Sequence, residues 1–537
     1  MKSLLILKAL FLGTFFCLAQ NPLDRPLPPD SYFYNPNINT TNRMTFPNGD
    51  NSTSALQGMI DSLSSSGGGV LTISPGTYTL EEVDIKTGVH IRVRPNVVFK
   101  SPLPAETIFS VGFANNFRNI SNWSFQSTNG TKCTFDFTNL QPNDKIRAFK
   151  LGNTTNFKVA DILILDNYTK FNALSSGAAG SSPAKFATFG IIENMDIKNA
   201  HYGYGLTQNQ VAQDMLFRNL SGEGGVTLRL ESGFKGLANL YLTDKTPIIN
   251  NVYARNISCT NGSHAVMLSP HTIMQGMVDI RDVSGTSCQA VVSISSGFLS
   301  KSKGQVDSNG NPLDGHTPGT FSEESVVANI SATYGTKAQT RGGRLRYVPC
   351  ALRGAINLSI NPDNESYTSP SIAPVLYLSL EDYVSFNNPA GKFKIVLDNL
   401  THTGFSSEVR ADGLITDGGE NDFEGCDIDG PPIFIVREDR NTPNPLQTST
   451  KAQTLNIEKN EVFGEVKVYQ DSGSNKLIIS SEASTEINLY SVLGKLVLSK
   501  KSKNQNTELD VSSLSKGLYI IQLKTPDRKL SKKIILN

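Results

Sequence analysis

The stretch that decides the fold is residues 225–233, which reads Gly-Val-Thr-Leu-Arg-Leu-Glu-Ser-Gly. Apolar side chains at 226, 228 and 230 alternate with polar ones at 227, 229 and 231. This period of two predicts a β-strand with one buried and one exposed face. The exposed face carries Arg229 and Glu231 side by side, so a cation and a carboxylate share one surface.

Segments of the same kind recur on both sides of this strand. Similar patterns lie at 200–208, 264–271 and 290–295, and each follows a short apolar run that ends in Asn or Asp, such as Val252–Asn256. Their spacing, irregular at roughly 20 to 37 residues, is close to the repeat of a solenoid. We therefore expect an all-β stack of coils, with residues 225–233 near the middle of its working face.

The N-terminal part of the pattern differs from the coils. Apolar residues recur at helical spacing over 54–63, after the capping residues Ser52 and Thr53, and short strands with Gly and Pro turns follow up to Phe99. A helix here suits a cap over the open first coil. This opening resembles the entry of right-handed parallel β-helix polysaccharide enzymes, which implies that fold.

The N-terminal segment and the bulk composition together predict an exported protein. Residues 1–19 combine Lys2 with an apolar run and predict a signal peptide cleaved after Ala19. No other stretch is long enough to span a membrane. The formal net charge of +1 with 18% charged residues gives no argument for nucleic acid. Five cysteines remain in the mature chain. We expect Cys259 and Cys288 to be buried thiols inside successive coils, with a disulfide between them as the alternative.

Four parts are expected along the chain: a signal peptide at 1–19, a β-helix domain at 20–440, a linker at 441–465 and a C-terminal domain at 466–537. The coil pattern disappears between about 301 and 390, which predicts an inserted subdomain. The last part contains short strands at the spacing of a small β-sandwich.

The C-terminal part resembles the sorting domain of the type IX secretion system of Bacteroidetes. The residues that carry the resemblance are Leu489–Gly494, Leu514–Tyr519 and the basic strand Lys532–Asn537. It implies the type IX machinery as a partner, and a secreted or cell-surface protein that passes through the periplasm. A carbohydrate-binding module is the alternative for this part.

Stacking brings equivalent positions of neighbouring coils about 4.8 Å apart. If the inward apolar residues set the register, Leu228 lies beside Val266, Leu230 lies beside Leu268, and His271 falls next to Gly233. Five polar groups then share one patch: Tyr204, Gln208, Arg229, Glu231 and His271. Such a patch suffices for cleavage of a glycosidic bond with Glu231 as proton donor. The alternative is a surface ion pair of Glu231 with Arg229, beside an unrelated aromatic and a loop histidine.

The order and spacing of Gly203-Tyr204, Gln208 and Arg229-Leu230-Glu231 resemble the ι-carrageenases of glycoside hydrolase family 82, which combine a β-helix of this size with an inserted domain. The likeness spans about 20–440. It implies that Glu231 is the general acid and that Gln208 holds water or an ion. It also implies that His271 is the site histidine and that Gly203, Tyr204 and Arg229 hold substrate.

One position departs from the family pattern. An aspartate base is expected two residues after the glutamate, a spacing of roughly 6.6 Å that is close to the carboxyl separation of inverting enzymes. Here that position is Gly233. The base must then come from a neighbouring coil or loop, such as Glu223 or Asp244, or His271 takes a larger part. A copy with altered specificity or weak activity is a further possibility.

A sulfated galactan is strongly anionic, and the planar guanidinium group suits sulfate. The arginines considered for substrate binding are Arg229, Arg255, Arg281, Arg341, Arg344, Arg346 and Arg353. Residues 307–311 resemble the start of a calcium loop, but Pro312 stands where such a loop needs glycine, so a plain turn is favoured. No His or Cys cluster has zinc spacing. We expect no required cofactor, although a structural Ca²⁺ is possible.

The sequence thus predicts a secreted, monomeric endo-hydrolase that cuts β-1,4 linkages of ι-carrageenan with inversion. Two other classes stay open. Another β-helix lyase or galactan hydrolase would be distinguished by its products, and a non-catalytic glycan-binding solenoid would bind without producing new reducing ends.

Overall fold

The computed structural model describes residues 21–49, 52–102, 106–114, 116–180, 183–313, 315–379, 384–385, 388–389, 391–406, 409 and 413–415, and in the C-terminal part 467–470, 476–480, 485–491, 495–502, 506–524 and 529–536. The predicted signal peptide and linker lie outside these residues. The chain divides into two compact units, residues 1–441 and 442–537.

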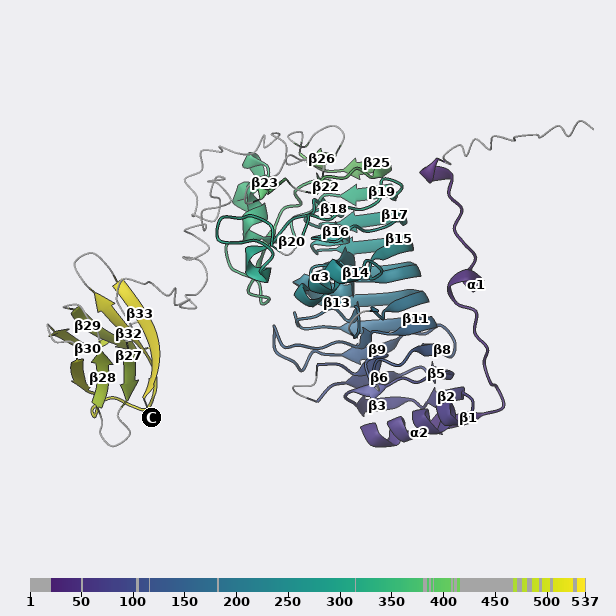
Figure 1. The fold of residues 1–537 in the computed structure, drawn as a ribbon, viewed down its shortest axis with the longest axis horizontal. Helices are drawn as coiled ribbons and strands as arrows, with labels where there is room; N and C mark the ends of the chain where they lie inside the picture. The colour runs from purple at the N-terminus through teal and green to yellow at the C-terminus, as the bar shows by residue number, and fades with distance from the viewer. Residues whose placement is uncertain are drawn as a thin grey trace, which may run out of the picture. The chain divides into compact units, whose positions relative to one another are not determined.

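The first unit is a parallel β-helix, as predicted (Figure 1). Its strands stack in three parallel ladders, which we call the first, second and third ladder. The first ladder contains all or part of β1 (Arg43–Phe46), β2 (Gly69–Ile73), β5 (Val89–Val93), β8 (Ile120–Ser127), β11 (Thr154–Leu165), β13 (Ala187–Asn209), β14 (Ala212–Glu231), β15 (Ile249–Thr260), β17 (Val278–Thr286), β19 (Val326–Thr333) and β25 (Val396–Thr403).

The other two ladders use the remaining strands and later parts of the long ones. The second begins with β3 (Gly76–Thr79), β6 (Val97–Lys100) and β9 (Cys133–Asp136), and continues through the second half of β11, β13, β14, β15, β17, β19 and β25. The third contains β4 (Val83–Asp84), β7 (Phe109–Val111), β10 (Phe149–Leu151), β12 (Leu174–Ser176), the last parts of β13 and β14, β16 (His264–Ser269), β18 (Val292–Ser295), β22 (Val375–Leu378) and β26 (Leu414–Ile415).

The corner between the first and second ladders is built from stacked asparagines and aspartates with left-handed backbone. Asn194, Asn219 and Asn256 have φ between 52° and 56°. Each amide donates to the residue one coil earlier, Asn256 to Asn219 at 2.9 Å and Asn219 to Asn194 at 3.0 Å. Asn tolerates this conformation better than most residues, so the side chain that permits the bend also links the coils.

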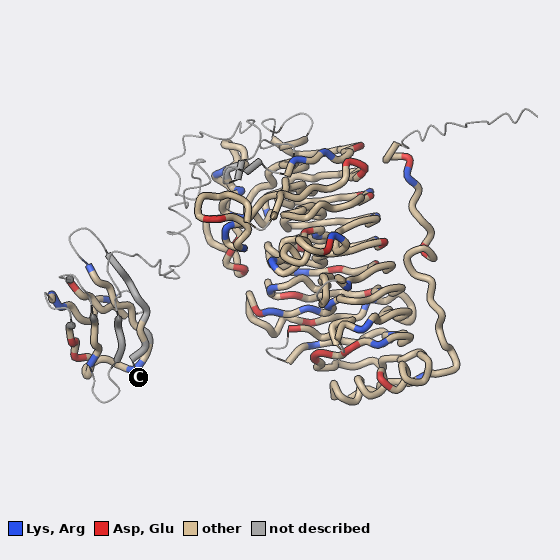
Figure 2. Tube along the Cα trace, viewed as in Figure 1, with Lys and Arg blue, Asp and Glu red and all other residues tan. Residues whose placement is uncertain are grey.

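Aromatic and aliphatic side chains fill the interior of the coils. Trp123 stacks on Phe157 one coil later, with ring centroids 5.3 Å apart and planes 5° apart. Cys259 and Cys288 are buried free thiols, as predicted, and burial raises the pKa of Cys259. Charged residues of both signs are interspersed along the coils (Figure 2), in keeping with the net charge of +1.

A helix covers the first coil. In α2 (Thr53–Ser65), the Ser52 hydroxyl caps the N-terminus by accepting from the Ala55 amide at 3.1 Å. Leu56, Ile60 and Leu63 are completely buried against the first strands. The predicted capping helix is therefore present, and it removes the exposed edge of the stack.

The chain before the cap crosses many coils. This strap, residues 21–42, contains η1 (Pro22–Asp24) and α1 (Asp30–Phe33) and runs alongside the stack (Figure 1). Arg218 donates to both carboxylate oxygens of Asp30, and Tyr32 donates to Asp214 at 2.5 Å. The strap thus ties coils together that lie far apart in the sequence.

The prediction of one continuous insertion at about 301–390 is wrong. β19 and β22 both lie within that range and pair in the ladders. Two excursions, 296–325 and 334–374, leave the coils instead. They contain η2 (Lys301–Lys303), β20 (Ala338–Arg341), η3 (Gly342–Tyr347), η4 (Cys350–Ala355) and β21 (Ser366–Ser369), and the two-residue strands β23 (Val384–Ser385) and β24 (Asn388–Pro389) follow β22. Leu345, Tyr347 and Tyr367 of the second excursion form a hydrophobic cluster with Leu376 and Leu378 of β22.

A helix that the sequence did not reveal follows the central strand. α3 (Lys235–Thr243) begins four residues after Glu231, and Leu237 and Tyr241 pack with Val211 and Ile273. It lies outside the stack because a helix does not fit into a coil of strands.

The second unit contains two antiparallel sheets. One consists of β27 (Lys467–Gln470), β28 (Lys476–Ser480) and β31 (Asn506–Asp510), and the other of β30 (Leu496–Ser502), β29 (Thr485–Ser491), β32 (Gly517–Lys524) and β33 (Lys529–Leu536). They share a core that includes Leu477, Leu489 and Ile521, as expected for a small sandwich. Among the described residues, no helix has the length and apolarity needed to cross a membrane.

Candidate active site

The candidate site lies on the third ladder, where the last part of β14 pairs with β13 on one side and β16 on the other. Leu228 is in register with Val266, and Leu230 with Leu268. The predicted register is therefore confirmed, and Arg229 and Glu231, which alternate with Leu228 and Leu230, point away from the core.

Glu231 is the centre of a hydrogen-bonded group. One carboxylate oxygen contacts Nε2 of His271 at 2.8 Å. The other accepts from Nε of Arg229 and, at 3.5 Å, from the amide of Gln208. Arg229 also donates to the carbonyl of Gly203 one coil earlier. The Glu231 side chain keeps 12% exposure, so the group is held inside the face but reaches solvent.

Two opposing effects act on the Glu231 carboxyl. Burial raises its pKa, while the charge of Arg229 and the hydrogen bond from His271 lower it. Together Arg229 and His271 outweigh burial, and the pKa of Glu231 lies well below its usual range. In the unliganded protein Glu231 is therefore an ionised carboxylate at neutral pH.

His271 is fixed in one neutral tautomer. Burial lowers its pKa, and the Lys303 ammonium lies 3.3 Å from Nδ1. An ammonium group can only donate, so Nδ1 accepts and Nε2 carries the proton that it gives to Glu231. The ring packs on Phe298 with centroids 4.5 Å apart. Sequence reasoning missed Lys303, because it comes from an excursion with no coil pattern.

His271 also occupies the space beside position 233. A β-carbon on Gly233 would lie 2.8 Å from Nε2 of His271, closer than a real contact allows. Lys303 donates to the Gly233 carbonyl on the same side. The glycine that replaces the expected aspartate therefore makes room for the histidine in this position.

Tyr204 stands among four charges on this face. Burial raises its pKa, the charges of Arg229 and Arg147 lower it, and those of Glu365 and Glu231 raise it. Its ring makes an edge contact with Phe171, with centroids 6.0 Å apart. Sequence reasoning placed Tyr204 here correctly.

A second carboxylate comes from the excursion at 334–374. Oε2 of Glu365 would lie 3.3 Å from a β-carbon at Gly203, and the Glu365 side chain is exposed. The turn that carries it is anchored by Asp363, which is completely buried and accepts from the amides of Glu365 at 2.9 Å and Tyr202 at 3.3 Å. No local sequence pattern could have shown this approach.

The two carboxylates named from sequence as possible bases lie elsewhere. Glu223 is on the second ladder, opposite Thr260. Asp244 accepts from the Ala184 amide at 2.6 Å and from Thr246, at the end of α3. Among the described residues, no hydrogen bond or ion pair joins either carboxylate to Glu231 or its partners.

The predicted substrate arginines separate into different environments. Arg255 lies on the first ladder and pairs at 2.9 Å with Asp279, so the prediction that it belongs to the site face is wrong. Arg281 pairs with the same aspartate. Arg353 is buried and donates to the Val348 carbonyl at 2.9 Å.

Arg344 lies nearer the site. Burial raises the pKa of Tyr202, and the charge of Arg344 opposes that rise, so the guanidinium group is close to the residue that precedes Gly203. The side chain of Arg346 lies outside the described residues.

The described residues contain no group of three or more His, Cys, Asp or Glu side chains placed to hold a metal ion. Asp307 accepts from the amides of Asn309 and Asn311, each at 2.8 Å, which forms a turn.

The fold and the carboxylate-centred face define a β-helix glycoside hydrolase. The chain is 30% identical over 389 residues to an ι-carrageenase of Zobellia galactanivorans, an alignment that covers 63% of this chain and 76% of that protein. It is 36% identical over 254 residues to an ι-carrageenase of Alteromonas macleodii, which covers 46% and 50%. The chain belongs to the ι-carrageenase family, glycoside hydrolase family 82.

Solved structures agree with this assignment. A 1,3-α-1,4-β-D-galactose-4-sulfate-3,6-anhydro-D-galactose-2-sulfate 4-galactohydrolase superposes with a TM-score of 0.64 at 26% identity, covering 74% of this chain and 95% of that one. An ι-carrageenase complexed to ι-carrageenan fragments gives 0.62 at 25% identity, with 73% and 94% coverage. Residues 467–537 match the secretion system C-terminal sorting domain.

Proposed function

We propose that this chain is an endo-acting hydrolase that cleaves the β-1,4 linkages of ι-carrageenan with inversion, using Glu231 as general acid. The observation that carries the proposal is the convergence of Arg229, His271 and Gln208 on the carboxylate of Glu231. An open ladder of parallel strands gives a polymer room to lie across this group.

The acid must be protonated, whereas Glu231 is ionised in the unliganded protein. Arg229 is the strongest cause that lowers its pKa, and a guanidinium group also binds sulfate well. When a substrate sulfate draws Arg229 away, burial dominates and the pKa of Glu231 rises. Binding of the sulfated polymer therefore prepares the acid, and an uncharged galactan leaves it ionised.

Glu365 supplies the base in this proposal. Its carboxylate reaches the same face beside Gly203 and has open access to solvent. It takes a proton from water as the water oxygen bonds to the anomeric carbon, while Glu231 gives its proton to the departing glycosidic oxygen. One water is consumed, and the mechanism needs no cofactor.

The remaining residues position the reactants. Gln208 holds the attacking water or the carboxylate at the centre, and Tyr204 and Arg344 contact the sugar chain. The neutral His271 keeps Glu231 oriented through its Nε2 proton. The sorting domain at 467–537 directs the enzyme to the cell surface or the medium, where it acts as a monomer.

Reaction with ι-, κ- and λ-carrageenan, agarose and pectin tests the proposal. We expect new reducing ends only with carrageenans, ι-carrageenan first, a rapid fall in viscosity, and α-configured products by NMR. Unsaturated ends that absorb in the ultraviolet would identify a lyase instead. Binding of ι-carrageenan without new reducing ends would identify a glycan-binding solenoid, which the absence of a carboxylate at Gly233 keeps as the second candidate.

A further inference from the structure

A cavity of about 280 Å³ adjoins the candidate active site on the side of the earlier coils. Its lining includes Gln208 of the site and Phe234, whose side chain is 62% exposed at the rim. The remaining lining residues come from four segments of the fold, contain no Asp or Glu, and include Phe113, Arg147, Lys150, Phe171, Asn172 and Ser175.

Two cations in this lining lack a directly bonded carboxylate, although the charge of Glu106, which pairs with Lys145, acts on both. Neither Arg147 nor Lys150 forms an ion pair within the described part of the chain. Arg147 instead lies over the ring of Phe171, 3.6 Å from its centroid, and Lys150 lies 4.3 Å from that of Phe113. Burial lowers the pKa of Arg147 to about 10, so the guanidinium group is charged at neutral pH, and burial also lowers the pKa of Lys150. Two cations without a carboxylate in direct contact, in a partly buried cavity, favour an anionic ligand.

An unsatisfied amide points to the same cavity. Asn172 is 1% exposed, and neither its side-chain oxygen nor its nitrogen has a hydrogen-bond partner among the described residues. The Nε of Arg147 is also buried without a partner. Buried polar groups are nearly always paired, so these atoms call for a ligand that both donates and accepts hydrogen bonds.

The cavity is in line with the catalytic residues. Lys150 pairs in register with Ser175, Ser175 with Gln208, and Gln208 with Arg229. Three steps of the ladder place Lys150 roughly 14 Å from Arg229 along the stack. One polymer chain can therefore reach both places.

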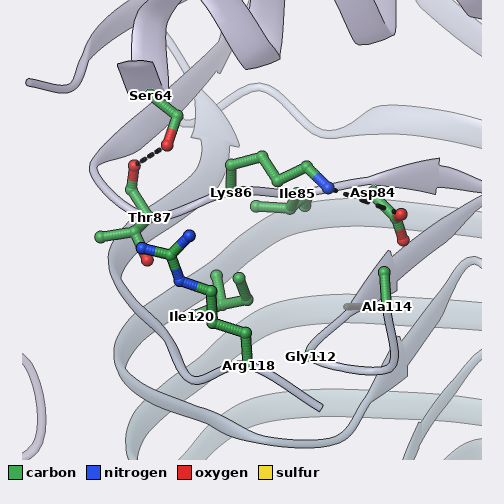
Figure 3. Close-up of a pocket in the computed structure, with 9 residues that line it drawn as sticks. All are labelled: Ser64, Asp84, Ile85, Lys86, Thr87, Gly112, Ala114, Arg118 and Ile120. Carbon is green, nitrogen blue, oxygen red and sulfur yellow. Dashed lines mark hydrogen bonds and ion pairs between the residues drawn. The ribbon is translucent and has the colours of Figure 1, made fainter. Parts of the chain in front are cut away.

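A second cavity serves as a comparison. It is lined by Lys86, Asp84 and Arg118 near the cap, measures about 80 Å³, and has Lys86 already paired with Asp84 at 3.6 Å (Figure 3). One of its two cations is paired with a lining carboxylate, and its volume is small. The features of the first cavity are thus not shared by every hollow between the coils.

We propose that the cavity around Arg147, Lys150 and Asn172 is a subsite that binds one sulfated sugar of the substrate. Its sulfate pairs with Arg147 and Lys150, its hydroxyl groups satisfy Asn172, and its apolar ring face lies on Phe234. The inference rests on the proposed function for the identity of the polymer, and it adds the place where a sulfated unit is held away from the bond that breaks.

Binding measurements on the full chain test this subsite. Calorimetry with Glu231→Gln compares ι-carrageenan octasaccharide with the same oligosaccharide after desulfation. Adding Arg147→Gln and Lys150→Gln should weaken binding of the sulfated form about tenfold or more and leave the desulfated form unchanged, because charge-assisted hydrogen bonds are lost. Arg118→Gln, which removes a cation in the comparison cavity, should change neither. Arg147→Lys should restore part of the affinity.

The outcomes are separable. A loss below about threefold, or an equal loss with the desulfated form, overturns the subsite, as does full affinity in a folded Asn172→Leu chain. If the double variant fails to melt cooperatively, the same binding measurements on the single variants Lys150→Gln and Asn172→Leu test the subsite instead. If the wild type releases no reducing ends from ι-carrageenan but needs Arg147 and Lys150 to bind it, the subsite stands and the hydrolase proposal fails. If the double variant is active and its KM is unchanged, the hydrolase proposal stands and the subsite fails.

Discussion

Oε1 of Glu231 lies 2.8 Å from Nε2 of His271, although the two residues are separated by 40 positions in the chain. The bond joins the end of β14 to the turn that follows β16, so its length depends on the register of two neighbouring coils. Because Lys303 occupies the other ring nitrogen, the histidine donates to the carboxylate and does not compete with it for a proton. The carboxylate and the ring therefore act as one positioned group.

Replacement of Glu231 with Gln should remove the proton donor without changing shape. We expect kcat to fall about 10²-fold to 10⁴-fold, the usual contribution of general acid catalysis, while the melting temperature stays close to that of the wild type. A reducing-end assay and circular dichroism check this, with Glu323→Gln at an exposed position as the control. Activity within tenfold of the wild type would show that another group donates the proton.

Replacement of Glu365 with Gln should lower kcat with little effect on KM, because the base acts on water and not on the bound sugar. Azide, a small nucleophile that needs no base, should restore turnover and yield a glycosyl azide detectable by mass spectrometry. Glu323→Gln again serves as the control. An unchanged kcat for Glu365→Gln would assign the base elsewhere on the face.

Proton uptake should accompany substrate binding. In the free protein the pKa of Glu231 is far below neutral, so the group is ionised. Pairing of Arg229 with sulfate removes the main lowering cause, and the pKa rises. At pH near 6 the Glu365→Gln variant should then take up close to one proton per oligosaccharide, measured by calorimetry in buffers of different ionisation enthalpy. Arg229→Gln should abolish the uptake, and zero uptake with intact Arg229 would contradict the activation of Glu231 by substrate.

A side chain at position 233 should displace His271. A β-carbon there would lie 2.8 Å from Nε2, so Gly233→Ala should lower kcat at least tenfold by breaking the contact with Glu231. For the same reason Gly233→Asp alone should not raise activity. The pH profile and rate of both variants test this, and a more active Gly233→Asp chain would show that the histidine position is not required.

The buried carboxylate of Asp279 should be important for stability. It is completely buried and pairs with Arg255 at 2.9 Å and Arg281 at 2.8 Å, with Arg25 of the strap at 3.7 Å. Asp279→Asn leaves three cations with a neutral partner and should lower the unfolding free energy by about 3 kcal/mol. Urea denaturation measures it, with Lys476→Gln in the second unit as the control, and a change below about 1 kcal/mol would contradict the role.

The sequence was informative where local pattern and stacking act together. Alternation around Leu228 and Val266 was enough to predict the register, and with it the meeting of Glu231 and His271. The same alternation did not place Arg255 correctly. It shows that a side chain points outward, but it does not show on which ladder the strand lies. Glu365, Lys303 and Arg147 were missed for another reason. They reach the site through excursions or through coils whose spacing in sequence is irregular.

The asparagine corner has a consequence for how this enzyme can change over time. Each amide bonds only to the turn directly beneath it, so a coil can be duplicated, deleted or given a new outer loop while its neighbours keep their geometry. Natural selection can thus lengthen the substrate-binding face, or change the loops that border it, by one whole coil at a time. Insertions and deletions should therefore be tolerated well between the corners and poorly at the corner asparagines.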